Sequence, residues 1–167
     1  NKTYFELGAD IQYDNTVDNN SKCIGNGEGG DHSFSEVFDG KGYTISGIRM
    51  LSSRLAQGLF GWSWGGTVKN VILTDAIFSG SGYYAGGIVG YNQGTVENCL
   101  VIDVTVGGNG DHGAVVGVND QGTVTNSYYR NCTVGSESNL SNAHIVTAGD
   151  YVTASIEDYS AGIEYTT

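Results

Sequence analysis

Aromatic side chains near the middle of the sequence could bind a ligand. Trp62 and Tyr91 each directly follow a Gly in similar local sequences, and Trp64 lies two residues after Trp62. Sugar rings stack on exposed aromatic faces, so these residues predict a glycan-binding surface. The alternative is that Trp62 and Tyr91 only cover an apolar corner of the fold. Val118 at the third equivalent position favours that alternative, because a binding strip should continue.

The partner that such a surface would take is limited by charge. The 167 residues carry 7 basic and 18 acidic side chains, for a net charge of −11. This balance repels acidic polysaccharides and favours a neutral or basic glycan. It also predicts no nucleic-acid partner, because binding phosphates needs clustered Lys and Arg.

A second candidate chemistry is calcium binding. Asp14, Asp18, Glu28 and Asp31 share a loop-rich region, and carboxylate oxygens are the ligands that Ca²⁺ prefers. Two interpretations stay open, a structural calcium site or solvated surface carboxylates. The sequence predicts no other cofactor and no further metal site.

Two patterns that can indicate an enzyme occur in the sequence, but the residues around them do not support catalysis. Residues 25–30 satisfy the GxGxxG pattern, but no helical pattern follows to present an N-terminus to phosphate, which indicates a loop. Glu97 and Asp103 would share one coil of the fold described below, yet their neighbours build no acidic row of the kind a glycosidase needs. We therefore predict no catalytic residues and no enzyme.

Composition narrows the fold class. The chain has 27 Gly and no Pro, and the glycines are not at every third position, which excludes collagen. No apolar run approaches the roughly 18 residues of a membrane-spanning helix, so we expect no transmembrane segment. The first residue is not Met and no leader pattern is visible, so we expect part of a larger polypeptide.

The elements that position these residues follow from an internal repeat. Three segments read Gly-Thr-Val-x-Asn, at residues 66–70, 94–98 and 122–126, and successive copies are 28 residues apart. Residues 42–47 are interpreted as a degenerate earlier copy. A period of this length indicates a solenoid.

Apolar residues alternate with polar ones after each repeated Asn, which is a strand pattern. Val71 and Leu73 are followed by Ala76 and Phe78, with a corner at residues 74–75. Three short strands in each 28-residue turn predict an all-β fold, a right-handed parallel β-helix of about four coils. We expect this β-helix at residues 34–134, an N-terminal cap at 1–33, and a C-terminal cap or the start of another β module at 135–167.

Two sets of repeated polar residues are predicted to form structural ladders from coil to coil. Stacked amides at a corner would satisfy backbone groups that the turn leaves open. Repeated Thr residues would lie in a second file, which also includes Thr44 of the degenerate copy. The predicted ladder residues are Asn70, Asn98 and Asn126, with Thr67, Thr95 and Thr123.

Three cysteines leave at least one thiol unpaired, and their spacing matches no zinc site. Cys99 and Cys132 occupy inward positions equivalent to Val71 and Ala76. They lie on different coils and different strands, so we expect small buried hydrophobes and no mutual disulfide.

The repeat resembles the GLUG repeat, which reads Gly-Leu-x-Gly followed by Gly-Thr-Ile/Val-x-Asn. The matching first halves are residues 58–61, 87–90 and 114–117, where Ala114 replaces the first Gly. GLUG repeats occur in bacterial surface proteins and beside immunoglobulin A peptidase domains, outside the catalytic domain. The resemblance implies a non-enzymatic stalk or adhesin module of a secreted or cell-surface bacterial protein, whose partner would be a host or cell-wall glycan or protein. The alternatives are a glycan-binding module and the remnant of a carbohydrate-active enzyme.

Overall fold

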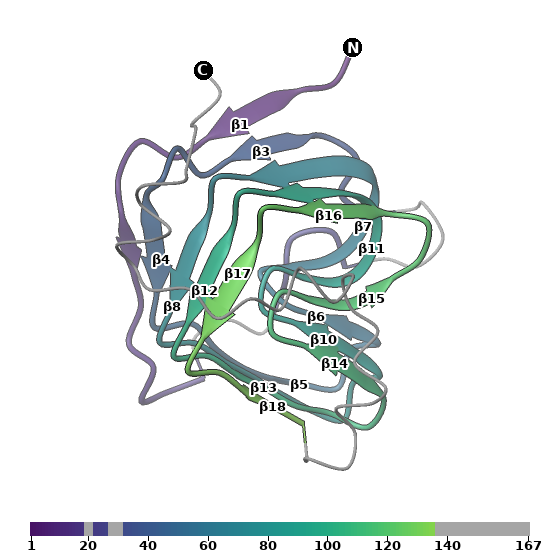
Figure 1. The fold of residues 1–167 in the computed structure, drawn as a ribbon. Coiled ribbons are helices and arrows are strands. Elements are labelled where there is room, and N and C mark those ends of the chain that lie inside the picture. Colours follow the sequence, from purple (N-terminus) through teal and green to yellow (C-terminus); the bar gives the residue numbers. More distant parts are fainter. Residues whose placement is uncertain (19–21, 27–31, 136–167) are drawn as a thin grey trace.

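The computed structural model describes residues 1–18, 22–26 and 32–135. The described residues form strands and turns with no helix, and all strand pairs are parallel. The chain winds into a parallel β-helix of about four coils, as predicted (Figure 1). None of this part of the chain is a helix long and apolar enough to cross a bilayer.

Four parallel sheets form the walls of the solenoid, here named A to D. Sheet A contains β1 (Tyr4–Glu6), β3 (Val37–Asp39), β7 (Phe60–Lys69), β11 (Val89–Glu97), β15 (Val116–Asn119) and β16 (Thr123–Thr125). Sheet B contains β2 (Ile11–Gln12), β4 (Thr44–Ser46), β8 (Ile72–Thr74), β12 (Leu100–Ile102) and β17 (Tyr128–Arg130). Sheet C contains β5 (Arg49–Ser52), β9 (Ile77–Gly80), β13 (Thr105–Val106) and β18 (Thr133–Val134). Sheet D contains β6 (Ala56–Gln57), β10 (Tyr84–Gly86) and β14 (Asp111–Gly113).

Each coil crosses the four sheets in turn, as β7, β8, β9 and β10 do before β11 begins the next coil (Figure 1). The sequence pattern predicted three strands per coil. The fourth, in sheet D, is only two or three residues long in each coil. Such a short segment shows no measurable alternation, so its strand is visible only through its partners.

Two corners flank sheet B and have left-handed backbone. Asn70, Asn98 and Asn126 have φ of 55°, 53° and 47° at the first corner. The second corner has positive φ at Asp75, Asp103 and Asn131, at the positions that the sequence predicted. Asn and Asp tolerate this conformation better than other non-glycine residues, which explains their repetition at these sites.

The interior is filled by side chains that stack in register from coil to coil. Val96 of β11 pairs with Val68 on one side and Val124 on the other, so the Val shared by the three Gly-Thr-Val-x-Asn segments stacks from coil to coil. At the N-terminal end the ring of Phe60 lies 4.7 Å from that of Phe34 and 5.3 Å from that of Phe38, between ring centroids. One continuous apolar core therefore extends along the solenoid axis.

The first coil departs from the predicted alignment. Thr67, Thr95 and Thr123 lie in register on sheet A, as expected. Thr44 lies instead on sheet B, opposite Ile72, and Val37 takes the position opposite Thr67. The prediction that Thr44 joins the Thr file is therefore wrong, because residues 40–42 form the turn at the Asn70 corner and shift the motif by one sheet.

The three thiols are free. Cys99 is fully buried, and Cys132 is half-buried and packs against the core, as their inward positions predicted. Burial raises the pKa of Cys99 to about 12 and raises that of Cys132. Both side chains therefore act as packing residues and are poor nucleophiles.

Candidate functional site

An aromatic cluster lies on the outer face of sheet A. Trp62 of β7 and Tyr91 of β11 are register partners, as the repeat predicted, and Val118 follows on β15. The Trp62 and Tyr91 rings are stacked, with centroids 4.0 Å apart and planes 22° apart. Tyr84 of sheet D packs edge-on against both rings, at 5.0 Å from Tyr91 and 6.3 Å from Trp62. The two stacked rings therefore cover one face of each other.

The polar atoms of this cluster are bonded to one another. Trp62 Nε1 donates to Gln93 Oε1 at 3.3 Å, and Gln93 Nε2 donates to Asp120 Oδ2 at 2.9 Å. The Tyr91 hydroxyl donates to the same Asp120 oxygen at 2.8 Å. Burial, followed by this hydrogen bond and the Asp120 charge, raises the pKa of Tyr91 to about 12. The network fixes the ring orientations and occupies the donors that a sugar would otherwise use.

The accessible aromatic surface lies beside this stack. Trp64 is the register partner of Gln93, faces outward two residues after Trp62, and is 48% exposed. Tyr83, in the turn before β10, is 56% exposed. Of the three predicted ligand-binding residues, Trp62 and Tyr91 contact each other, and Trp64 offers the most open ring.

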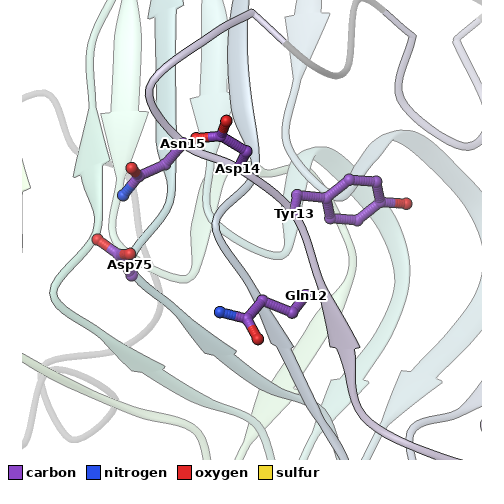
Figure 2. Close-up of a pocket in the computed structure, with 5 residues that line it drawn as sticks. All are labelled: Gln12, Tyr13, Asp14, Asn15 and Asp75. Carbon is purple, nitrogen blue, oxygen red and sulfur yellow. The ribbon is translucent and has the colours of Figure 1, made fainter.

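A separate open pocket lies where the N-terminal segment passes the second corner (Figure 2). Its volume is about 490 Å³, and it is lined by Gln12, Tyr13, Asp14, Asn15 and Asp75. Figure 2 shows the Asn15 side chain directed toward Asp75, with the Asp14 carboxylate farther from Asp75 and the Tyr13 ring pointing away. The lining thus offers carboxylate and amide oxygens.

This pocket includes one residue of the predicted calcium site. Both the Thr16 amide and the Thr16 hydroxyl donate to Asp14 Oδ1, which lowers the Asp14 pKa. Asp18 accepts a hydrogen bond from the Leu51 amide, while Glu28 and Asp31 lie outside the described residues. Within the described ranges no three His, Cys, Asp or Glu side chains form a group suited to a metal ion. Calcium binding stays a prediction.

At the first corner, two of the three predicted ladder residues, Asn70 and Asn98, are hydrogen-bonded to each other. Asn98 Nδ2 donates to Asn70 Oδ1 at 3.4 Å, and Asn70 Nδ2 donates to Asp39 Oδ1 at 2.9 Å. Asn126 occupies the same corner on the last described coil, where it is exposed. We call Asp39, Asn70, Asn98 and Asn126 the corner ladder. Its contacts run from coil to coil and leave no opening for a ligand at Asn70.

Asp39 was missed because it lies outside the repeated motif. Its carboxylate is buried, and it accepts hydrogen bonds from the Tyr4 hydroxyl, the Asn70 amide and the Lys41 backbone N–H. Lys69 Nζ lies 3.8 Å from Asp39 Oδ2. Burial alone would raise the pKa of Asp39, but these hydrogen bonds and the Lys69 charge together lower it. The first coil thus ends the ladder with an ionised, fully bonded carboxylate.

A second polar file, inside sheet A, was also missed. Asn92 Nδ2 donates to Asn119 Oδ1 at 2.8 Å, and Asn92 Oδ1 accepts from the Gly94 amide at 3.1 Å. Ser63 is the register partner of Asn92 on the preceding coil. The signal was present, because each of these residues lies two positions after the second Gly of the Gly-x-x-Gly block. We call Ser63, Asn92 and Asn119 the inner file.

Comparison with known proteins supports the repeat motif and indicates no specific function. The family model described as the GLUG motif matches residues 81–109, the stretch from the turn before β10 to the residues after β13. No curated protein and no solved structure matches the chain. The coils before and after residues 81–109 keep the same register across sheets A, B and C. Residues 81–109 therefore match the GLUG motif, and the flanking coils repeat their register.

Proposed function

We propose that this protein is a non-enzymatic structural module, a rigid stalk or adhesin segment of a larger polypeptide. The observation that carries the proposal is the coil-to-coil pairing of its polar side chains. In the corner ladder Asn98 donates to Asn70 and Asn70 donates to Asp39, and in the inner file Asn92 donates to Asn119, so these bonds between coils stiffen the solenoid. Polar groups that are already hydrogen-bonded within the solenoid do not serve to bind a substrate.

Stiffness follows from the sheet architecture as well. Strands of consecutive coils are hydrogen-bonded in parallel ladders on all four walls, and the interior contains one continuous apolar core. Each coil contacts mainly its neighbours, so length can be added without redesigning the fold. A module of this kind suits a spacer that holds another domain away from a surface.

The cellular setting of the proposal rests on the GLUG resemblance. On that basis we propose a secreted or cell-surface bacterial protein with an adhesive role toward host or cell-wall glycan or protein. The acidic net charge keeps such a module soluble at a surface.

Two measurements test this proposal. Beads coated with the folded protein should be retained on host cells or isolated cell walls, while beads coated with denaturant-unfolded protein should not. The folded coils should also survive trypsin and proteinase K for far longer than the unfolded chain. Retention equal to uncoated beads would exclude adhesion, and digestion as fast as that of the unfolded chain would exclude a rigid stalk.

Glycan binding is the second candidate, and the exposed ring of Trp64 favours it. This ring lies beside the ordered Trp62–Tyr91 stack, so a sugar could bind it without disturbing the stack. A glycan array with the native protein should then show neutral or basic glycans that Trp64→Ala loses. Tyr43→Ala removes an exposed ring elsewhere and is the matched control. The site is excluded if no glycan binds, or if binding survives Trp64→Ala.

A further inference from the structure

A histidine is buried on the inner side of sheet D. His112 is the middle residue of β14 and is 1% exposed. Its register partner on the preceding coil is Ala85, which belongs to the main apolar core, and Gln57 holds the same position on the first coil. Register partners in neighbouring strands share a face of the sheet, so the imidazole faces the interior.

The surroundings of His112 do not suit a charge. Neither ring nitrogen has a hydrogen-bond partner among the described residues. A Cβ on Gly108 would lie 3.2 Å from His112 Nε2 and 2.5 Å from the Gly82 carbonyl oxygen, which already accepts from the Asn109 amide. A neutral imidazole leaves one donor and one acceptor unpaired here, whereas the imidazolium would leave two donors and a positive charge unpaired. The protonated form is therefore the more costly one to bury.

Few ionisable groups near His112 could compensate for that charge. Asp111 precedes it in β14 and lies beside Tyr84 of β10, while Tyr83 is in the turn before β10. Arg54 precedes β6 on the first coil, and β6, β13 and β15 contain no acidic or basic side chain. Burial lowers the pKa of His112, and the backbone of the preceding turn and the Asp111 charge offset this shift only in part.

The strand that carries this histidine is well placed to open. β14 is three residues long, and within the described part of the chain it ends sheet D and pairs only with β10 (Figure 1). Three of the four residues at 107–110, in the turn before it, are Gly. Short segments with few backbone hydrogen bonds open at low free energy. Opening would bring the imidazole into water, where the ordinary pKa of His is about 6.5.

We propose that His112 makes sheet D acid-sensitive, because uptake of a proton by its buried imidazole releases β14 from β10. The position itself does not require a titratable residue, since Gln57 and Ala85 occupy it on the first two coils. The third coil alone combines an imidazole with the last described strand of the sheet. The device thus lies in the one described coil where opening breaks a single strand pair of sheet D.

Release of β14 should also reach the aromatic cluster on the outer face. Asp111 of β14 is the register partner of Tyr84. The Tyr84 ring packs edge-on against both Trp62 and Tyr91. Acidification should therefore loosen this contact while the strands of sheet A stay paired.

Hydrogen exchange of the whole chain at pH 7.5 and pH 5.0, each corrected for the intrinsic exchange rate, tests the proposal. An open state with an ordinary imidazole is favoured up to about 30-fold more at pH 5.0, because it binds a proton that the buried ring does not. Protection of residues 111–113 should fall by at least about tenfold. Protection of β11 should change by less than about twofold.

Two matched variants separate His112 from general effects of acid. His112→Gln copies the residue of the first coil and should keep its protection at pH 5.0. His32→Gln removes an exposed imidazole and should retain the full acid response. If His112→Gln weakens β14 at both pH values, His112→Ala, which copies the second coil, takes its place. Equal protection of native β14 at the two pH values would overturn the proposal, as would an equal fall in both His112 variants.

Tryptophan emission tests the link to the aromatic cluster. Trp64→Phe leaves Trp62 as the one tryptophan of the chain. Its emission should change between pH 7.5 and pH 5.0, and the change should disappear when His112→Gln is added. Constant emission alongside lost protection of β14 would overturn the link between the two regions.

Discussion

The corner ladder and the outer face of sheet A show opposite behaviour along the same repeat. At the first corner three successive coils have Asn with left-handed backbone, and the first coil supplies Asp39 to the same contacts. On the outer face the equivalent position holds Trp62, then Tyr91, then Val118. The first corner keeps its residue type because its backbone geometry and burial demand Asn, whereas the position of Trp62 on the outer face varies from coil to coil. Features specific to this protein should therefore be sought on the outer faces.

The largest loss of stability is expected where the backbones of neighbouring coils pack closely. Gly90→Ala would place a Cβ 2.7 Å from both the backbone N and O of Gln57 on the preceding coil. Because both contacts are backbone, the coils must separate, and we expect a loss of about 2–3 kcal/mol in the free energy of unfolding. Denaturant unfolding followed by circular dichroism measures it.

Gly8→Ala is the matched control for Gly90→Ala, because its added Cβ meets no atom within 4 Å. It should change stability by less than about 0.5 kcal/mol. Equal stabilities for Gly90→Ala and Gly8→Ala would show that the spacing between coils adjusts without cost. Close contact between coils would then not explain why residue types are kept at the buried positions.

A smaller loss is expected from the corner ladder itself. Asn70→Gly retains easy access to the φ of 55° but removes the hydrogen bond to Asp39, for an expected loss of about 1–2 kcal/mol. Asn70→Ala should cost about 1 kcal/mol more, because Ala is strained in the left-handed region. If Asn70→Gly is as stable as the native protein, the side-chain hydrogen bond contributes nothing and Asn70 is needed only for its backbone conformation. The difference in stability between the Gly and Ala variants measures the cost of the left-handed conformation separately from the hydrogen bond.

Acid pH should weaken the corner ladder more than the exposed surface. The pKa of Asp39 is lowered in the folded state, so the unfolded chain binds the proton first as pH falls. Its contribution is complete above about pH 4–5 and is lost as pH falls through the lowered folded pKa. Asp39→Asn should therefore flatten the fall of stability below about pH 5, measured by denaturant titration at each pH.

Asp14→Asn is the control for this acid dependence. The pKa of Asp14 is also lowered, but its carboxylate is exposed, and the hydrogen bonds that lower the pKa come from the nearby Thr16 hydroxyl and amide. Its removal should leave the acid limb nearly unchanged. An acid limb that responds equally to both variants would contradict the special role of Asp39.

The smallest effect is expected on the outer face. Tyr91→Phe keeps the ring stack and removes the hydrogen bond to Asp120, for a loss of about 0.5–1 kcal/mol at neutral pH. The folded pKa of Tyr91 is raised to about 12 from an ordinary value of 10.0, so this contribution is present below pH 10 and lost as pH rises toward 12. The Phe variant should lack that part of the alkaline loss, with phenolate absorbance reporting the titration. A loss larger than that of Asn70→Gly would reverse the ranking of the two regions.

Much of the fold could be predicted from the sequence because the repeat and the strand pattern are local and periodic. The 28-residue spacing and the period-two alternation specified the parallel coils, the Val68–Val96–Val124 stack, the corners at Asn98 and Asp103, and the inward position of Cys99. A solenoid makes this possible, since a residue one repeat away in sequence is the neighbour in space.

Only the tertiary structure shows the contacts of residues whose spatial neighbours are not one repeat away in sequence. The first coil has its own loop length, so Thr44 moved to sheet B and Asp39 joined the corner ladder, and no pattern within the repeat announces either. The stacking of Trp62 on Tyr91 depends on ring orientation, which is set by Tyr84 of β10, Gln93 of β11 and Asp120 after the end of β15. Residues 99–102 form an unbroken apolar run in the sequence, but only the structure places Cys99 and Val101 in the main core and Leu100 and Ile102 outside it. Repetition determines register, whereas contacts made across coils of unequal length and on the outer walls require the assembled solenoid.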